Sequence, residues 1–187
     1  MTEEQRYDVV RTEPTYEVRR YHPHAVAEIE VDGTFESAGN AAFRPLVGYI
    51  GGRNVGGDSM AMTAPVIQRS DAPTALGAET TTESTGPGKF IVSFVLPADT
   101  DPSRAPVPTD ERVHVRMVDE EYAAVTRFSG RWTSSSYAKR VAELVAALDA
   151  DGLSAAGPTR FARFDPPWTP WFKRRNEVVI PLHSPAG

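Results

Sequence analysis

Two pairs of side chains in this sequence have the chemistry of metal ligands. His22 and His24 flank a proline, and imidazole is a common ligand of haem iron and of other metals. Met60 and Met62 carry soft thioether sulfurs, which ligate iron or pack against a flat ring. Each pair also has a simpler interpretation: solvated histidines at a turn, and methionines that fill gaps in a core or pocket. The residue pattern leaves both interpretations open.

Two tryptophans near the end of the chain have the shape to hold a planar ligand. Trp168 and Trp171 lie among prolines, and each ring offers a large, rigid contact surface. The alternative is that the two rings close one end of the fold. The basic run Lys173 to Arg175 follows, with the charge to pair with acidic groups of a ligand, and we expect an internal partner for Arg175.

The composition excludes several other kinds of site. The chain has no cysteine, so disulfides, thiolate metal sites and cysteine nucleophiles are absent. The segment GGRNVGG lacks the lysine and the spacing of phosphate-binding loops, and no serine has the context of a nucleophile elbow. Glu28 and Glu30 share one face of an expected strand, and an exposed strand face explains them better than a catalytic carboxylate pair.

Charge and hydropathy limit the partners of the chain. With 187 residues and a formal net charge of −5, it lacks the basic surface that binding to nucleic acids requires. Its first residues contain no apolar core of a secretory signal, and no stretch approaches the roughly 18 apolar residues of a membrane span. We therefore expect a cytoplasmic protein that binds neither nucleic acid nor membrane; the sequence does not indicate its oligomeric state.

A first helix is predicted in front of the methionine pair. Thr34 or Ser37 would cap it, Pro45 would kink it, and Gly51-Gly52 would end it. Its apolar stripe has helical spacing and consists of Phe43, Leu46, Val47 and Ile50. Alternation then predicts a strand from Ser59 to Ile67 that carries the methionines, with Pro65 at a strand end or sheet edge.

The rest of the chain is predicted to contain a second helix and further strands. The second apolar stripe runs from Tyr137 to Leu148; Ser134 or Ser135 would cap this helix and Gly152 would end it. Residues 1–14 are expected to be a loosely held lead-in, and residues 70–88 a long exposed loop. The first predicted strand runs from Tyr16 to a turn at Pro23. The others are Ala25 to Val31, Lys89 to Leu96, Arg112 to Val118, Ala123 to Phe128, Thr159 to Phe164 and Glu177 to Leu182.

The chain contains an internal repeat. A shift of 97 positions superimposes two strand–turn–strand–glycine–aromatic–helix segments, and it pairs Val18 with Val115, Arg19 with Arg116, Ala27 with Ala124, Gly33 with Gly130 and Ser37 with Ser134. We interpret this as two β-β-α-β-type halves that share one core. The second half has no counterpart of the glycine loop and methionine strand, and this difference favours a ligand site in the first half.

Four separated motifs, in order, resemble the SOUL haem-binding protein family: YEVRRY, YIGGRN, MAMTAPV and RFDPPWTPWFKRRNEVVI. The resemblance implies an α+β fold, a distorted antiparallel β-barrel from a duplicated unit with two main helices, similar to effector-binding domains of bacterial regulators. We therefore expect one domain over residues 1–187. Its core would cover 14–183, and its halves, 14–68 and 89–182, would be joined by the loop 70–88.

The resemblance also implies a haem or other tetrapyrrole, held in an apolar groove for carriage, buffering or sensing. On this sequence the groove would use Phe43, Leu46, Val47, Ile50, Met60, Met62, Trp168 and Trp171. The proposed iron-ligating histidine of one family member aligns with Arg20, which leaves His22 and His24 as the candidate axial ligands. The alternatives are a haem-dependent enzyme with an open iron face, and a binding module for another apolar molecule or a protein partner.

Overall fold

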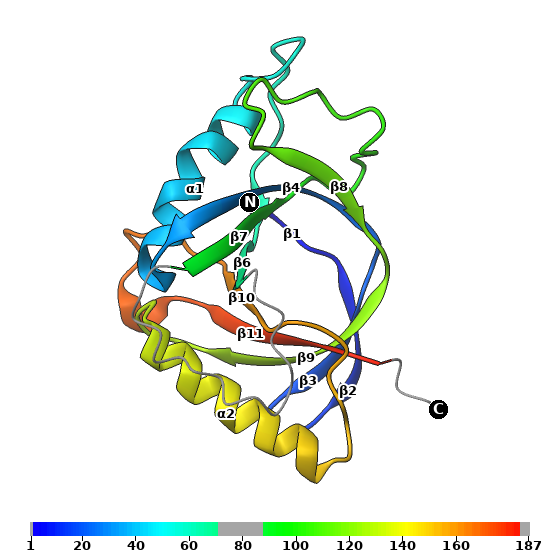
Figure 1. Cartoon of the computed structure of the whole chain (residues 1–187). Helices are drawn as coiled ribbons and strands as arrows, with labels where there is room; N and C mark the ends of the chain where they lie inside the picture. The colour runs from blue at the N-terminus through cyan, green and yellow to red at the C-terminus, as the bar shows by residue number, and fades with distance from the viewer. Residues whose placement is uncertain (1, 71–87, 184–187) are drawn as a thin grey trace.

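Two helices lie on the outer side of one curled antiparallel sheet in the computed structural model, which describes residues 2–70 and 88–183 (Figure 1). The helices are α1 (Phe35–Ile50) and α2 (Ser134–Ala150), and a short 3-10 turn, η1 (Trp171–Lys173), lies near the chain's end. The predicted α+β class and barrel-like sheet are confirmed. The strands are β1 (Glu3–Glu4), β2 (Tyr7–Thr12), β3 (Glu17–Tyr21), β4 (His24–Gly33), β5 (Thr63–Ala64), β6 (Val66–Ser70), β7 (Gly88–Val95), β8 (His114–Val118), β9 (Glu121–Phe128), β10 (Arg160–Arg163) and β11 (Asn176–Leu182).

Both helices begin at a threonine. Thr34 caps α1 in a reciprocal capping box with Ser37, so each side chain binds the other's backbone N–H. The helix continues through Pro45 and ends at Gly51. Thr133 caps α2 by accepting from the backbone N–H of Ser136; the prediction of a serine cap for this helix was therefore wrong.

Two stretches differ from their predicted structure. The expected loose lead-in contains β1, which pairs in parallel with β5, and β2, which pairs antiparallel with β3. The predicted strand of nine residues is reduced to β5 and β6, separated by the cis peptide bond Ala64–Pro65, and both methionines precede β5. The predicted loop at 70–88 lies almost wholly outside the described residues.

The sheet order shows how the two halves of the repeat interlock. It reads β2–β3–β9–β11–β10–β6–β7–β4–β8, with β10 and β6 side by side at the centre. The repeat relates β3 to β8, β4 to β9 and α1 to α2. However, β3 pairs with β9 and β8 pairs with β4, so the first strand of each half joins the sheet of the other half. Neither predicted strand–turn–strand pair forms a hairpin; each turn is a crossing between the two halves.

Each helix covers an apolar cluster on the outer side of the sheet. Leu46 and Tyr49 of α1 pack on β4 and β7, and Tyr137 and Leu144 of α2 pack on β9 and β11. Phe35 bridges the two clusters, because its ring lies 5.3 Å from the Tyr137 ring. The opposite, concave face of the sheet carries a smaller apolar cluster surrounded by charged residues. The fold therefore offers two separate surfaces, one outside and one inside the curl.

Candidate functional site

Of the four residues in the helical stripe predicted to face a ligand, three pack against the core and one is exposed. Leu46 and Ile50 are buried under α1, and Val47 packs on the same cluster. Phe43 is almost half exposed, and its ring meets that of Phe94 on β7 edge to face, with centroids 6.0 Å apart. Among these four residues, Phe43 is the one with a large apolar surface open to a ligand.

The two methionines lie near the end of α1 and differ in exposure. The backbone N–H of Met60 donates to the carbonyl of Ile50, and its side chain packs against the cluster below α1. Met62 is well exposed and precedes β5. The glycine loop between α1 and these residues is closed by Asn54, whose amide donates to the carbonyls of Tyr49 and Asp58. This loop returns the chain to the helix end and places Met60 beside it.

The late proline-rich loop presents a group of exposed aromatic rings. Trp168 is 83 % exposed, Trp171 is 51 % exposed and Phe172 is 57 % exposed. Arg174 holds the loop from within by donating to the carbonyls of Thr169 and Pro167. The rings are therefore presented on a backbone that is tied to itself, and the interpretation of the tryptophans as a plug would require them to be buried. Phe172 was not singled out from the sequence, although it follows Trp171 directly.

Stacked arginines attach this loop to the beginning of both helices. The guanidinium groups of Arg163 and Arg174 lie 4.7 and 4.9 Å from the ring centre of Trp132. A side chain at Gly39 of α1 would meet Arg163 at 2.4 Å, so the glycine allows this arginine to lie against the helix. Phe43 is one helical turn further along from Gly39, and the loop passes beside the start of α1 (Figure 1). The structure thus brings the late loop and the first half of α1 together.

A basic side chain that the sequence did not single out lies at the exposed rings. The guanidinium group of Arg131 is 5.9 Å from the ring centre of Trp171. Within residues 2–70 and 88–183 the structure gives Arg131 neither an ion pair nor a side-chain hydrogen bond. Its position just before Trp132 was the available signal. An aromatic surface with an uncommitted cation fits a flat ligand that carries acidic groups.

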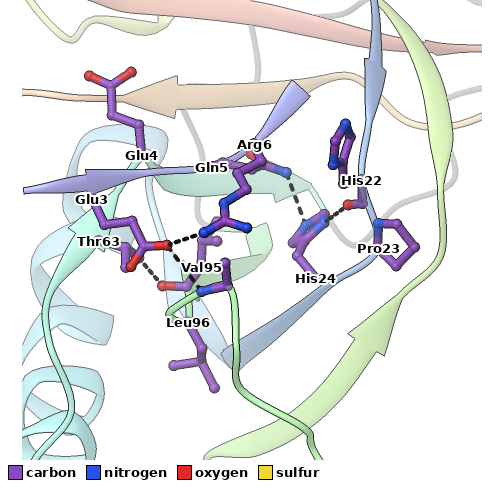
Figure 2. A pocket seen from close by; sticks show the side chains of 11 residues that line it. Glu3, Glu4, Gln5, Arg6, His22, Pro23, His24, Thr63, Val95 and Leu96 are labelled. Atoms are coloured by element: carbon purple, nitrogen blue, oxygen red, sulfur yellow. Dashed lines mark hydrogen bonds and ion pairs between the residues drawn. The ribbon is translucent and has the colours of Figure 1, made fainter. Parts of the chain in front are cut away.

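The two candidate axial histidines lie in a different part of the molecule (Figure 2). His22 donates from Nε2 to Asp8 at 3.0 Å. His24 is buried; its Nδ1 donates to the His22 carbonyl at 2.8 Å, and its Nε2 accepts from Gln5 at 3.0 Å. Burial lowers the pKa of His24 and favours this neutral form. Both nitrogens of His24 therefore already have partners.

The histidines and the tryptophans lie on different sides of the sheet. The connection between β3 and β4 carries His22, and His24 is the first residue of β4; this connection lies across the sheet from the loop between β10 and β11 (Figure 1). We name the exposed rings of the late loop, Arg131 beside them and the exposed ring on α1 together the aromatic face: Phe43, Arg131, Trp168, Trp171 and Phe172. Met60 and Met62 lie toward the other end of α1, which at 16 residues is about 24 Å long.

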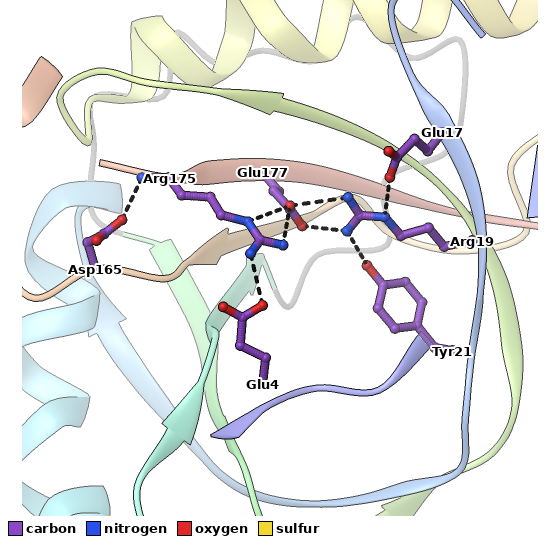
Figure 3. A network of polar contacts seen from close by, with 7 residues as sticks. All are labelled: Glu4, Glu17, Arg19, Tyr21, Asp165, Arg175 and Glu177. Carbon is purple, nitrogen blue, oxygen red and sulfur yellow. Dashed lines mark hydrogen bonds and ion pairs between the residues drawn. The ribbon is translucent and has the colours of Figure 1, made fainter. Parts of the chain in front are cut away.

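An ion-pair network occupies one end of the concave face (Figure 3). Glu177 accepts from Arg19 at 2.8 and 3.3 Å and from Arg175 at 3.0 Å, and Arg175 also pairs with Glu4. The expected internal partner of Arg175 is therefore Glu177. Burial lowers the pKa of Arg19, but the bond and charge of Glu177 outweigh this and raise it. Burial raises the pKa of neighbouring Tyr21 to about 12, so its hydroxyl stays protonated beside Arg19.

Neither a metal cluster nor a spanning helix is found in the described part of the chain. No three histidine or acidic side chains gather there in an arrangement that could hold a metal ion. Within the same residues, neither helix is long and apolar enough to cross a membrane.

Comparisons with known proteins identify the fold and the family of this chain. The sequence profile described as SOUL heme-binding protein matches residues 2–181. Heme-binding protein 1 of Xenopus tropicalis is 30 % identical over 165 residues, which are 87 % of this chain and 81 % of the relative, and that of Xenopus laevis is 28 % identical over the same shares. The crystal structure of the EcmrR C-terminal domain has the same fold, with a TM-score of 0.65 at 12 % identity over 95 % of this chain and 98 % of that one. The chain therefore belongs to the SOUL heme-binding protein family.

Proposed function

We propose that this protein binds haem on the aromatic face and that it carries or buffers haem without an axial bond from His22 or His24. The observation that supports this most is the exposure of three aromatic rings in one short loop, with Arg131 beside Trp171. Soluble proteins rarely leave such rings together in water without a partner. Membership of the SOUL family makes haem the ligand of choice for this surface.

The side chains of the aromatic face match the parts of a porphyrin. Apolar contact contributes about 25 cal/mol per Å² of buried apolar surface, so Phe43, Trp168 and Trp171 can hold a flat ring without a bond to iron. Arg131 is placed to pair with a propionate, as guanidinium groups do with carboxylates. A site of this kind, open and without strong ligation, suits release of the ligand to another protein and therefore carriage or buffering.

A hemin titration followed at the Soret band tests the proposal. We expect a saturable shift at micromolar protein, and an affinity about fivefold weaker or more for Trp171→Ala, because one aromatic contact contributes about 1 kcal/mol beyond its area. Val10→Ala is the matched control, since Val10 is also 51 % exposed and lies on β2, away from the aromatic face. Equal affinity of the two variants would show that haem does not bind at this face.

The role of the other polar groups can be separated in the same assay. We expect Arg131→Ala to weaken hemin binding, and Arg104→Ala, in an exposed loop, to leave it unchanged. His22→Ala should leave the position of the Soret band unaltered. A changed Soret position in that variant would assign the iron ligand to His22 and contradict the proposal.

A further inference from the structure

The concave face of the sheet contains a hollow whose lining includes no residue of the aromatic face. It is a cavity of about 450 Å³, within the size range of small-molecule sites, and it lies between β4, β6 and β8 on one side and residues 156–158 on the other. Both helices pack on the opposite face of the same sheet. A ligand in this cavity therefore contacts none of the residues assigned to haem.

Three arginines from three strands line the cavity, and they face only two carboxylates. Arg116 binds Glu28 through two parallel hydrogen bonds of 2.9 and 3.1 Å, and Arg160 pairs with Glu121 at 2.5 Å. Arg69 also lines the cavity, and in the described ranges 2–70 and 88–183 it has no hydrogen-bond or ion-pair partner. Among the described residues, the arginines that line the cavity therefore outnumber their carboxylate partners by one, in a protein of net charge −5.

Two further observations describe the charged lining of the cavity. The Nε of Arg160 is buried without a hydrogen-bond partner within the described residues, and the Oε1 of its ion-pair partner Glu121 is buried beside it. His24, which also lines the cavity, has its pKa lowered mainly by burial; the charges of Arg160 and Arg116 lower it further, while the bond to the His22 carbonyl and the charge of Glu121 raise it. His24 is neutral and hydrogen-bonded on both nitrogens, so the charge of the cavity comes from its arginines.

The remaining walls are apolar. Val26, Ile67 and Leu182 are buried residues that line the cavity, and Pro158 and Pro181 complete it on the side of residues 156–158. A ligand that consisted of a charged group alone would leave these apolar walls exposed to water. The combination of an unmatched guanidinium and apolar walls instead fits a molecule with an acidic head and an apolar body.

We propose that this cavity binds a small organic anion, whose carboxylate or phosphate pairs with Arg69 while its apolar body lies against Val26, Ile67 and Leu182. Planar carboxylates and phosphates are the groups that a guanidinium binds with two parallel hydrogen bonds. The site is separate from the aromatic face and does not depend on haem binding.

Calorimetric titration with probes of one size and different charge tests the proposal. We expect saturable binding of benzoate or phenyl phosphate, or of both, and none of benzyl alcohol or benzylammonium, because only the first two carry an anion. The stronger of the two binders identifies the head group. Absence of binding by both anions, or binding of benzylammonium with similar affinity, would overturn the proposal.

Variants locate the site and separate it from haem. Arg69→Ala should weaken the anion about tenfold or more, because it removes a charge-assisted hydrogen bond, whereas Arg104→Ala should bind as the wild type does. The Soret titration of Arg69→Ala with hemin should match the wild type. Unchanged anion affinity in Arg69→Ala, or an equal loss of hemin and anion binding, would show that no separate anion site exists at Arg69.

Discussion

Arg19 and Arg116 occupy matching positions in the two halves of the repeat and have very different surroundings. The side chain of Arg19 is 4 % exposed and donates to Glu177, Glu17 and Tyr21 (Figure 3). The side chain of Arg116 is 46 % exposed and is held by one carboxylate, that of Glu28. The same residue of the repeat is thus part of a closed network in one half and of a cavity wall in the other.

The difference has a structural cause in the first residues of the chain. β3, which carries Arg19, has β2 beside it, and the ring of Tyr7 lies 4.1 Å from the Arg19 guanidinium. β8, which carries Arg116, is the last strand of its sheet, with no further strand beyond it in the described residues. The segment before the repeat therefore covers one end of the concave face. The same position of the repeat therefore carries a buried arginine where a neighbouring strand covers it, and an accessible arginine where the described residues provide no such strand.

The largest effect on stability is expected from Glu177→Gln, in the buried ion-pair network around Arg19. Glu177 compensates both Arg19 and Arg175, and its removal leaves buried positive charge, so the free energy of unfolding should fall by about 3–5 kcal/mol. Urea denaturation measures this, with Glu143→Gln as the control, since Glu143 pairs with Arg140 at the surface of α2. A loss no greater than that of the control would contradict a closed, structural network.

A smaller effect on stability, dependent on pH, is expected at His24, which lines the same cavity as Arg116. The pKa of His24 is lowered in the folded state, mainly by burial, so folding favours its neutral form. Its contribution to stability is fully present above the unfolded pKa of about 6.5 and is lost as the pH falls through the lower folded value. Thermal denaturation between about pH 7 and 5 should show a steeper loss for the wild type than for His24→Gln. Parallel pH profiles would show that His24 is not a buried neutral group.

The smallest effect is expected from Arg116→Met. The Arg116 side chain is 46 % exposed, its partner Glu28 is 14 % exposed, and the pair involves no second arginine, so its loss should cost about 1 kcal/mol. The matched substitution, Arg19→Met, leaves Glu177 buried with one fewer partner and should cost several times more. Both are measured in the same urea series. Equal losses of unfolding free energy in the two variants would show that Arg19 and Arg116 contribute equally to stability.

Local patterns predicted the helices well and the peripheral strands poorly. The apolar stripes of α1 and α2 have helical spacing and large buried residues, so periodicity alone located them. β1 and β2 are short and mostly exposed, with no buried face of their own, and what stabilises them is pairing with β5 and β3. Such strands have no pattern of their own, which is why the lead-in was predicted as loose. The threonine cap of α2 was missed because several hydroxyl residues are adjacent there.

The candidate haem residues were predicted from motifs, and the structure sorted them by exposure. Phe43, Trp168 and Trp171 have open surface, whereas Leu46 and Ile50 are in the core under α1. Arg131 was not predicted, because its closeness to Trp171 depends on the path of the loop between β10 and β11. Which of these residues hold haem remains a proposal, with the titrations above as its test.

The sequence by itself determined the family, the α+β class, the repeat and the two helices, because motifs and periodicity are properties of neighbouring residues. Only the tertiary structure decided what lies inside the curl. Arg69, Arg116 and Arg160 are far apart in the chain and line one cavity because β10 lies beside β6 and β8 beside β4. Strand order depends on interactions between distant segments, and no local spacing encodes it.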